Sequence, residues 1–122
     1  MGDFLGGGGE AAGPISEKGL INAYKRAKQS GVFLVSGQQL SVFPSELCKF
    51  QDYKPPDDSQ DWWDSHQLSR IDVSNNLIAT VPSEISIQQT LAHLNFAGNK
   101  IQELPDQIFE LENLKFLDIS NN

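Results

Sequence analysis

The sequence lacks several features on which common protein classes depend. It contains a single cysteine, Cys48, so it can form neither an internal disulfide nor a cysteine-based zinc site. No stretch approaches the roughly 18 consecutive apolar residues that a membrane span needs. Met1–Gly13 has neither the basic nor the apolar region of a secretory signal. We therefore expect a cytoplasmic or nuclear location and no membrane partner.

Basic residues are scarce as well. Lysine and arginine number 9 against 16 aspartate and glutamate residues, which gives a net charge of −7. Residues 1–30 are nearly balanced, with four basic and three acidic residues, so the acidic excess lies in residues 31–122. A negative body repels phosphate backbones, and we expect no nucleic-acid partner. The charge can equally serve only to keep the chain in solution.

Residue types that catalyse reactions or bind metals are few, and their spacing in the sequence does not indicate a common site. The two histidines are His66 and His93, and no spacing places either beside Cys48 as a catalytic base. No carboxylates accompany them at metal-ligand spacing. The Gly6–Gly9 run lacks the Gly-Lys-Ser/Thr of a phosphate-binding loop. We predict no catalytic residue, no cofactor and no metal, and therefore no enzyme.

An internal repeat is the strongest positive signal. The segment LSRIDVSNNLIATVPSEI, residues 68–85, matches LAHLNFAGNKIQELPDQI, residues 91–108, at a constant offset of 23. The matched pairs are Leu68 and Leu91, Ile71 and Leu94, Val73 and Phe96, Asn76 and Asn99, Ile78 and Ile101, Val81 and Leu104, Pro82 and Pro105, and Ile85 and Ile108. A third copy begins at Leu114, and the sequence ends within it at Asn122.

Each spacing in the repeat has a physical reason. Ile71 and Val73 lie two residues apart, so both point inward from a short strand while Asp72 points outward. The Asn76 amide can pair the backbone groups of the bend that follows the strand. The pattern resembles the leucine-rich repeat consensus. That resemblance implies an α/β solenoid, with short parallel strands on its concave face and loops or short helical turns on its convex face.

Two weaker segments precede the regular repeats. An offset of 38 from the first full repeat places Phe33 at the Ile71 position and Gln38 at the Asn76 position, which indicates a degenerate capping repeat. Residues 17–29 are predicted to form a helix with Ser16 as N-cap and Gly31 beyond its end. We expect this helix to cover the open end of the first repeat. The alternative is a basic peptide that binds a membrane or calmodulin.

The expected organisation has four parts. Residues 1–14 form a disordered glycine-rich terminus, 15–48 the capping helix and degenerate repeat, 49–65 an acidic insertion, and 66–122 two full repeats and a truncated one. Within the insertion, Trp62 and Trp63 either pack over the cap or anchor a partner. The aspartates around them match no calcium loop.

The outward strand positions are the candidate binding residues. One column across the sheet contains Arg70, His93 and Phe116, and the next contains Asp72, Asn95 and Asp118. This mixed face suits a protein partner whose basic patch meets Asp72 and Asp118. The alternative is that these side chains are only solvated and that binding uses later repeats.

The start of the chain narrows the resemblance. The segments GLINAYKRAKQSG, VFLVSGQQLSVFPSEL and DWWDSHQLSRIDVSNNLI resemble the N-terminus of the leucine-rich repeat-containing protein 40 family, and the 23-residue repeat resembles the intracellular Ras-group-related class. One departure is Gln88, which stands where the next repeat has Leu111, and we expect a loose convex side there. Since the last repeat stops at Asn122, we also expect marginal stability and self-association through its uncovered strand.

These observations predict a protein–protein interaction module. The resemblance implies the N-terminal part of an intracellular scaffold, with signalling proteins such as small GTPases as partners by analogy alone. One alternative is a purely structural cap for a longer array. Another is an accessory region of an enzyme whose catalytic domain lies beyond residue 122.

Overall fold

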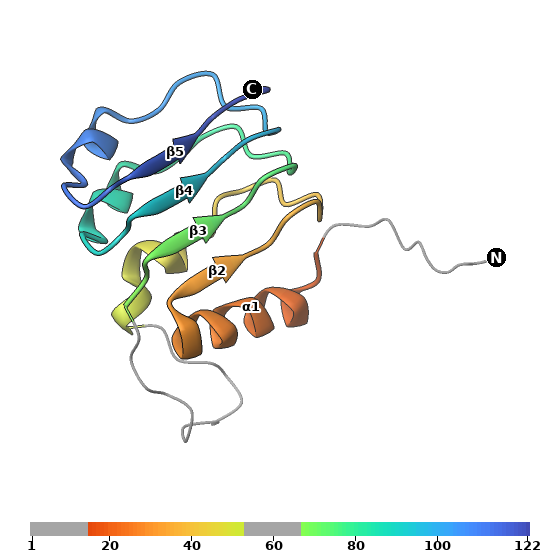
Figure 1. The fold of residues 1–122 in the computed structure, drawn as a ribbon. Helices are drawn as coiled ribbons and strands as arrows, with labels where there is room; N and C mark the ends of the chain where they lie inside the picture. The colour runs from red at the N-terminus through yellow and green to blue at the C-terminus, as the bar shows by residue number, and fades with distance from the viewer. Residues whose placement is uncertain (1–14, 53–66) are drawn as a thin grey trace.

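The computed structural model describes residues 15–52 and 67–122. Its elements in chain order are α1 (Glu17–Ser30), β2 (Val32–Leu34), the 3-10 helix η1 (Ser45–Asp52), β3 (Arg70–Asp72), the 3-10 helix η2 (Ser83–Ile87), β4 (His93–Asn95), the 3-10 helix η3 (Asp106–Glu110) and β5 (Phe116–Asp118). The strands form one parallel sheet in the order β2-β3-β4-β5, with α1 beside β2 (Figure 1). This arrangement confirms the predicted α/β solenoid with a helix at its N-terminal end.

Helix α1 begins and ends as its sequence predicts. The Ser16 hydroxyl accepts a hydrogen bond from the Gly19 N–H, and Gly31 follows the helix in the left-handed region with φ of 79°. A Cβ at Gly31 would lie 2.7 Å from the Gln67 carbonyl oxygen, so glycine is required on steric grounds too. The buried side of α1, which includes Tyr24 and Ala27, packs on the first coil of the solenoid. A coil here means one repeat, that is, one strand and the convex segment that follows it.

The sheet register follows the repeat spacing. Phe33 pairs with Ile71, Ile71 with Leu94, and Leu94 with Leu117. The first three of these side chains are fully buried and form the centre of the core. Because the register is continuous, residues at equivalent positions of successive repeats lie side by side along the solenoid.

Asparagine side chains close the bends of the solenoid, and the first two of them, Asn76 and Asn99, are buried. Asn76 Oδ1 accepts from the N–H groups of Gln38 and Leu40, and its Nδ2 donates to the carbonyls of Val35 and Val73. Each asparagine therefore pairs backbone groups of its own coil and of the coil before it. The same pattern recurs at the two later positions, Asn99 and Asn122. The predicted role of the amide at the bend is confirmed, with the added contact to the neighbouring coil.

The convex side is built from 3-10 helices that begin directly after the prolines. Pro82 precedes η2 and Pro105 precedes η3, and each helix buries one isoleucine in the core. Gln88 corrects the expectation of a loose convex side. Its side chain is only 1% exposed and forms two reciprocal amide hydrogen bonds of 3.1 Å with Gln51. Two polar groups thereby satisfy each other where other repeats place an apolar side chain.

The residues that follow the degenerate repeat belong to the core unit as far as Asp52. Lys49–Asp52, expected at the start of an acidic insertion, form the last part of η1, and Phe50 is buried there. The buried Lys28 ammonium donates to the Phe50 carbonyl and lies 4.4 Å from the centre of the Phe50 ring. The expected disorder of residues 1–14 and the Trp62–Trp63 pair lie outside the described residues.

Candidate functional site

The concave face brings the predicted binding residues together in two columns. The middle residue of each strand points into the core, so the residues on either side of it point toward the concave surface. Arg70 lies beside His93, and His93 beside Phe116, in the sheet register. One step along the strands, Asp72 lies beside Asn95, and Asn95 beside Asp118. Both columns therefore have the residue order that the repeat offset predicts.

The first column presents an aromatic surface. The rings of His93 and Phe116 are stacked, with their centroids 4.1 Å apart and their planes 11° from parallel. Phe116 is 43% exposed, so one part of its surface remains available beside the stack. Arg70 lies on the other side of His93 in the column, between it and Val32, and its side chain is 46% exposed. An exposed aromatic pair next to a guanidinium is the kind of surface on which a protein partner can dock.

The second column is less available than its sequence suggests. Asp72 Oδ1 accepts hydrogen bonds from the Ser74 N–H and hydroxyl, and Oδ2 lies 3.8 Å from the Arg70 guanidinium. Its side chain is only 11% exposed as a result. Asn95 Oδ1 accepts from the Ala97 N–H in the same way. The side-chain oxygens of Asp72 and Asn95 therefore accept hydrogen bonds within the bends after their strands, which leaves them fewer acceptor positions for a partner.

Asp118 repeats this local arrangement but stays accessible. Its Oδ1 accepts from the Ser120 hydroxyl at 2.7 Å and from the Ser120 N–H at 2.9 Å. These hydrogen bonds to the charged form lower the pKa of the Asp118 carboxyl below its ordinary value of 3.8. The group is therefore ionised at neutral pH. Asp118 is the acidic residue of the column that remains to meet a cation.

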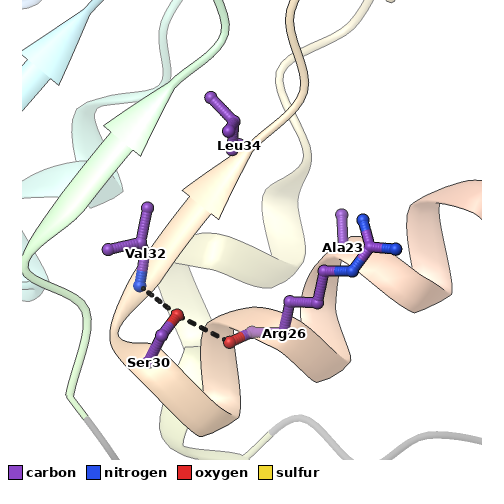
Figure 2. Close-up of a pocket in the computed structure, with 5 residues that line it drawn as sticks. All are labelled: Ala23, Arg26, Ser30, Val32 and Leu34. Atoms are coloured by element: carbon purple, nitrogen blue, oxygen red, sulfur yellow. Dashed lines mark hydrogen bonds between the residues drawn. The ribbon is translucent and has the colours of Figure 1, made fainter.

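Sequence reasoning missed a hollow at the N-terminal end of the concave face. Ala23, Arg26 and Ser30 of α1 line one side, and Val32 and Leu34 of β2 line the other, around about 200 Å³ (Figure 2). Leu34 is 56% exposed. Its place in the Asp72 column is readable from the offset, but a leucine in a strand pattern is ordinarily counted as core.

No arrangement for catalysis emerges in the described part of the chain. Cys48 is buried, and its burial, with a smaller contribution from Glu84, raises the pKa of the thiol to about 11. A thiol with that pKa is almost entirely protonated at neutral pH and is a poor nucleophile. Residues 15–52 and 67–122 contain no cluster of three metal-ligating side chains. Among the same residues, no helix has the length and apolar character needed to cross a membrane.

Comparison with known proteins identifies the repeat. Residues 66–122 match a family model described as leucine rich repeat. Over 108 residues, 86% of its length, the chain is 30% identical to leucine-rich repeat and calponin homology domain-containing protein 1 of Mus musculus. Over 52 residues, 43% of its length, it is 38% identical to oligodendrocyte-myelin glycoprotein of Homo sapiens. The chain spans 13% and 11% of these two relatives, respectively.

A solved structure has the same architecture. The chain resembles a leucine-rich repeat protein of Leptospira interrogans with a TM-score of 0.52 and 25% sequence identity. The match covers 75% of this chain and 25% of the solved chain. Both the repeat sequence and the arrangement of strands and turns are therefore found in known proteins.

Proposed function

We propose that the chain, whose residues 66–122 match the leucine-rich repeat model, is a protein–protein interaction module that uses its concave face. Leucine-rich repeat domains generally bind other proteins, and a solenoid of short strands offers a broad surface for this purpose. The stack of His93 on Phe116 carries the proposal for this chain. It places exposed aromatic area in a sheet column whose neighbouring positions are polar.

The chemistry of this face favours a basic side chain from the partner. A lysine or arginine can contact the exposed Phe116 ring while its charge meets the Asp118 carboxylate on the same strand. Such a contact at an exposed site contributes roughly 0.5 to 1 kcal/mol from the ring alone. Asp72 was expected to share this role, but its carboxylate is occupied by Ser74 and Arg70. We therefore assign the cation to Asp118 and Phe116.

A capture experiment with matched phenylalanine variants tests the proposal. The chain is immobilised, and proteins retained from a cell extract are quantified by mass spectrometry for the wild type and for Phe116→Asp. Phe109→Asp is the control, because Phe109 is 79% exposed but lies on η3, on the other side of the core from the sheet. We expect Phe116→Asp to remove the specifically retained protein and Phe109→Asp to keep it.

Two outcomes of this experiment are decisive against the concave face. Equal retention by both variants would mean that binding uses another surface. Loss with Phe109→Asp alone would assign binding to the convex side. Each bait is checked by size-exclusion chromatography, because self-association through β5 and the adjoining Ile119, which is 45% exposed, would hide the same residues.

The resemblance in the N-terminal segments supports a narrower assignment. We propose that the chain is an N-terminal part of a protein related to leucine-rich repeat-containing protein 40, acting as a scaffold in the cytoplasm or nucleus. A role in signalling, with small GTPases among the partners, rests on analogy with the intracellular Ras-group-related class. Fractionation of source cells followed by immunoblotting tests the location, and recovery only in a secreted fraction would contradict it.

A structural capping role is the second candidate, and the packing of α1 favours it. The helix buries Tyr24 and Ala27 against the first coil and thereby covers one end of the sheet. In that case α1 would be needed for stability while concave-face variants would bind normally. The two roles are compatible in one molecule, and the capture experiment distinguishes their contributions.

A further inference from the structure

The hollow between α1 and β2 has an apolar surface with one positive group on its rim. Val32 and Leu34 face it from the strand, and the buried Ala23 faces it from the helix. Figure 2 shows Arg26 extending from α1 on the side opposite the strand residues. The hollow is therefore amphipathic, and it lies at the β2 end of the two columns described above, whereas His93, Phe116 and Asp118 lie on β4 and β5.

Its walls are fixed in place by a hydrogen-bonded serine. The Ser30 hydroxyl donates to the Arg26 carbonyl at 2.7 Å and accepts from the Val32 N–H at 3.2 Å. This side chain links the last turn of α1 to the first residue of β2 (Figure 2). A ligand that enters does not have to order the walls, and this lowers the entropic cost of binding.

The size of the hollow limits what it can hold. About 200 Å³ is below the roughly 300 to 1,000 Å³ of sites that enclose drug-sized molecules. The space fits one large apolar side chain, such as leucine or phenylalanine. A segment of protein chain, which can place one side chain in the hollow and continue along the surface, is therefore a better occupant than a free small molecule.

The charges at the rim define the second feature of the occupant. In the part of the chain that the structure describes, no carboxylate pairs with the exposed Arg26 guanidinium. Arg70 lies beside Val32 in the sheet register, but its charge is partly neutralised by Asp72 at 3.8 Å. Because the protein as a whole carries a net charge of −7, a ligand with many acidic groups would be repelled. The local charge therefore favours a single carboxylate at Arg26.

We propose that this hollow binds a short segment of a partner protein that carries one large apolar residue and one acidic residue close to it. The apolar side chain occupies the space between Ala23, Val32 and Leu34, and the carboxylate pairs with Arg26. This site goes beyond the concave-face interface proposed above, because the two surfaces use different residues and opposite charges. A partner that meets both surfaces would gain from their combined effect.

Binding through one side chain and one ion pair is weak, so the test uses an NMR titration of the full 122-residue chain. The probes are four short serine- and glycine-based peptides, each with one leucine and with one glutamate placed from one to four positions after it. We expect at least one peptide to cause saturable shifts of backbone amide signals around Arg26, Val32 and Leu34. Replacing its glutamate by glutamine should weaken binding about two- to fivefold, the loss expected for an ion pair with an exposed guanidinium.

Variants of the chain test whether the peptide binds in the hollow. Arg26→Glu and Leu34→Asp should each weaken binding at least about tenfold. Lys18→Glu makes the same charge change on the exposed side of α1, outside the hollow, and should leave affinity within about twofold. His93→Ala should also bind normally, so failure of the concave-face proposal would not affect this result. Far-UV circular dichroism confirms that each variant is folded.

Three results would overturn the proposal. The first is the absence of saturable shifts with all four peptides at about 5 mM. The second is equal weakening by Arg26→Glu and Lys18→Glu, which would indicate a general charge effect. The third is concentration-dependent shifts of the hollow residues without any peptide, which would make a second copy of this chain the occupant.

Discussion

Residues 15–52 and residues 67–122 contribute strands to the same sheet but are held by different kinds of contact. In the later region the same asparagine position recurs, and each amide pairs backbone groups of two coils. In the first region Gln38 occupies that position, and its side chain is exposed. Its backbone instead donates to Asn76 Oδ1 and accepts from the Ile15 N–H.

The first region compensates with contacts that occur once. The Tyr24 ring stacks on Phe33 with centroids 5.3 Å apart, and the Tyr24 hydroxyl donates to Glu46. Lys28 joins α1 to η1 through the carbonyl and ring of Phe50. A regular solenoid can distribute stability over equivalent interfaces, whereas its end must be closed by specific side chains. The effect of a substitution should therefore depend on the region in which it lies.

The largest expected change in stability comes from Asn76, and the matched comparison is Gln38, which holds the same repeat position in the first region. Asn76→Ala removes five hydrogen bonds and takes away the side-chain partner of two N–H groups and one carbonyl of the first coil, those of Gln38, Leu40 and Val35. The carbonyls of its own coil keep other donors, from Asn99 and Gly37. We expect it to lower the free energy of unfolding by roughly 3 to 4 kcal/mol, measured by urea denaturation. Gln38→Ala should change it by less than about 0.5 kcal/mol. Similar losses for the two variants would show that the regions are not held differently.

A smaller effect is expected from the contact that joins α1 to η1. Lys28→Ala removes the ammonium from the Phe50 ring and leaves the Phe50 carbonyl without this donor. We expect a loss of about 2 kcal/mol in the free energy of unfolding. Lys18→Ala, an exposed lysine of the same helix, should stay within about 0.5 kcal/mol of the wild type. If both variants unfold with the free energy of the wild type, the contact of Lys28 with Phe50 does not stabilise the protein.

Alkaline pH should weaken the protein through Cys48. The folded thiol has its pKa raised to about 11 by burial and then by Glu84, whereas an unperturbed thiol ionises near 9.0. The stabilising contribution is complete below pH 9 and is lost as pH rises toward 11, because only the unfolded chain ionises readily in that range. Urea midpoints of wild type and Cys48→Ala at successive pH values isolate this effect. Parallel pH profiles would contradict it.

The smallest expected effect concerns Asp118, in the last strand. Hydrogen bonds from Ser120 lower the pKa of its carboxyl, so NMR titration should give a midpoint below 3.8. Ser120→Ala should raise that midpoint, because it removes the hydroxyl donor. The associated stabilisation is present above the unfolded pKa and is lost as pH falls through the folded one. An unchanged midpoint in Ser120→Ala would assign the shift to another cause.

Much of the fold could be predicted because it follows from local spacing. The offset of 23 predicts which residues share a column, and the register of His93 with Phe116 agrees with it. The caps of α1 depend on Ser16 and Gly31, both adjacent to the helix. The pairing of Gln51 with Gln88 was not predictable in this way, since the two amides are 37 residues apart and meet only after the solenoid has formed.

The sequence predicted where the residues of the candidate site lie, but not which of their side chains are exposed to a partner. The sequence places Asp72 outward, yet its exposure depends on the Ser74 hydroxyl and on the conformation of Arg70. The hollow depends on how α1 packs beside β2, a tertiary contact that no repeat spacing specifies. The burial of Lys28 also depends on tertiary packing. A lysine near the end of a basic helix is ordinarily solvated, whereas Lys28 is buried.

The asparagine contacts also set the order in which the coils can be completed during synthesis of the chain, because each asparagine pairs backbone groups of the preceding coil. The bend of the first coil is completed by Asn76, which the ribosome adds 38 residues after Gln38, and the bend containing Ile78 is completed by Asn99. At a synthesis rate of about 5 to 20 residues per second, a finished coil waits for roughly 1 to 8 seconds before its last hydrogen bonds can form. Until that asparagine has been added, the backbone groups that it pairs in the folded protein lack this partner, so each coil can be completed only after the strand of the next coil has been synthesised.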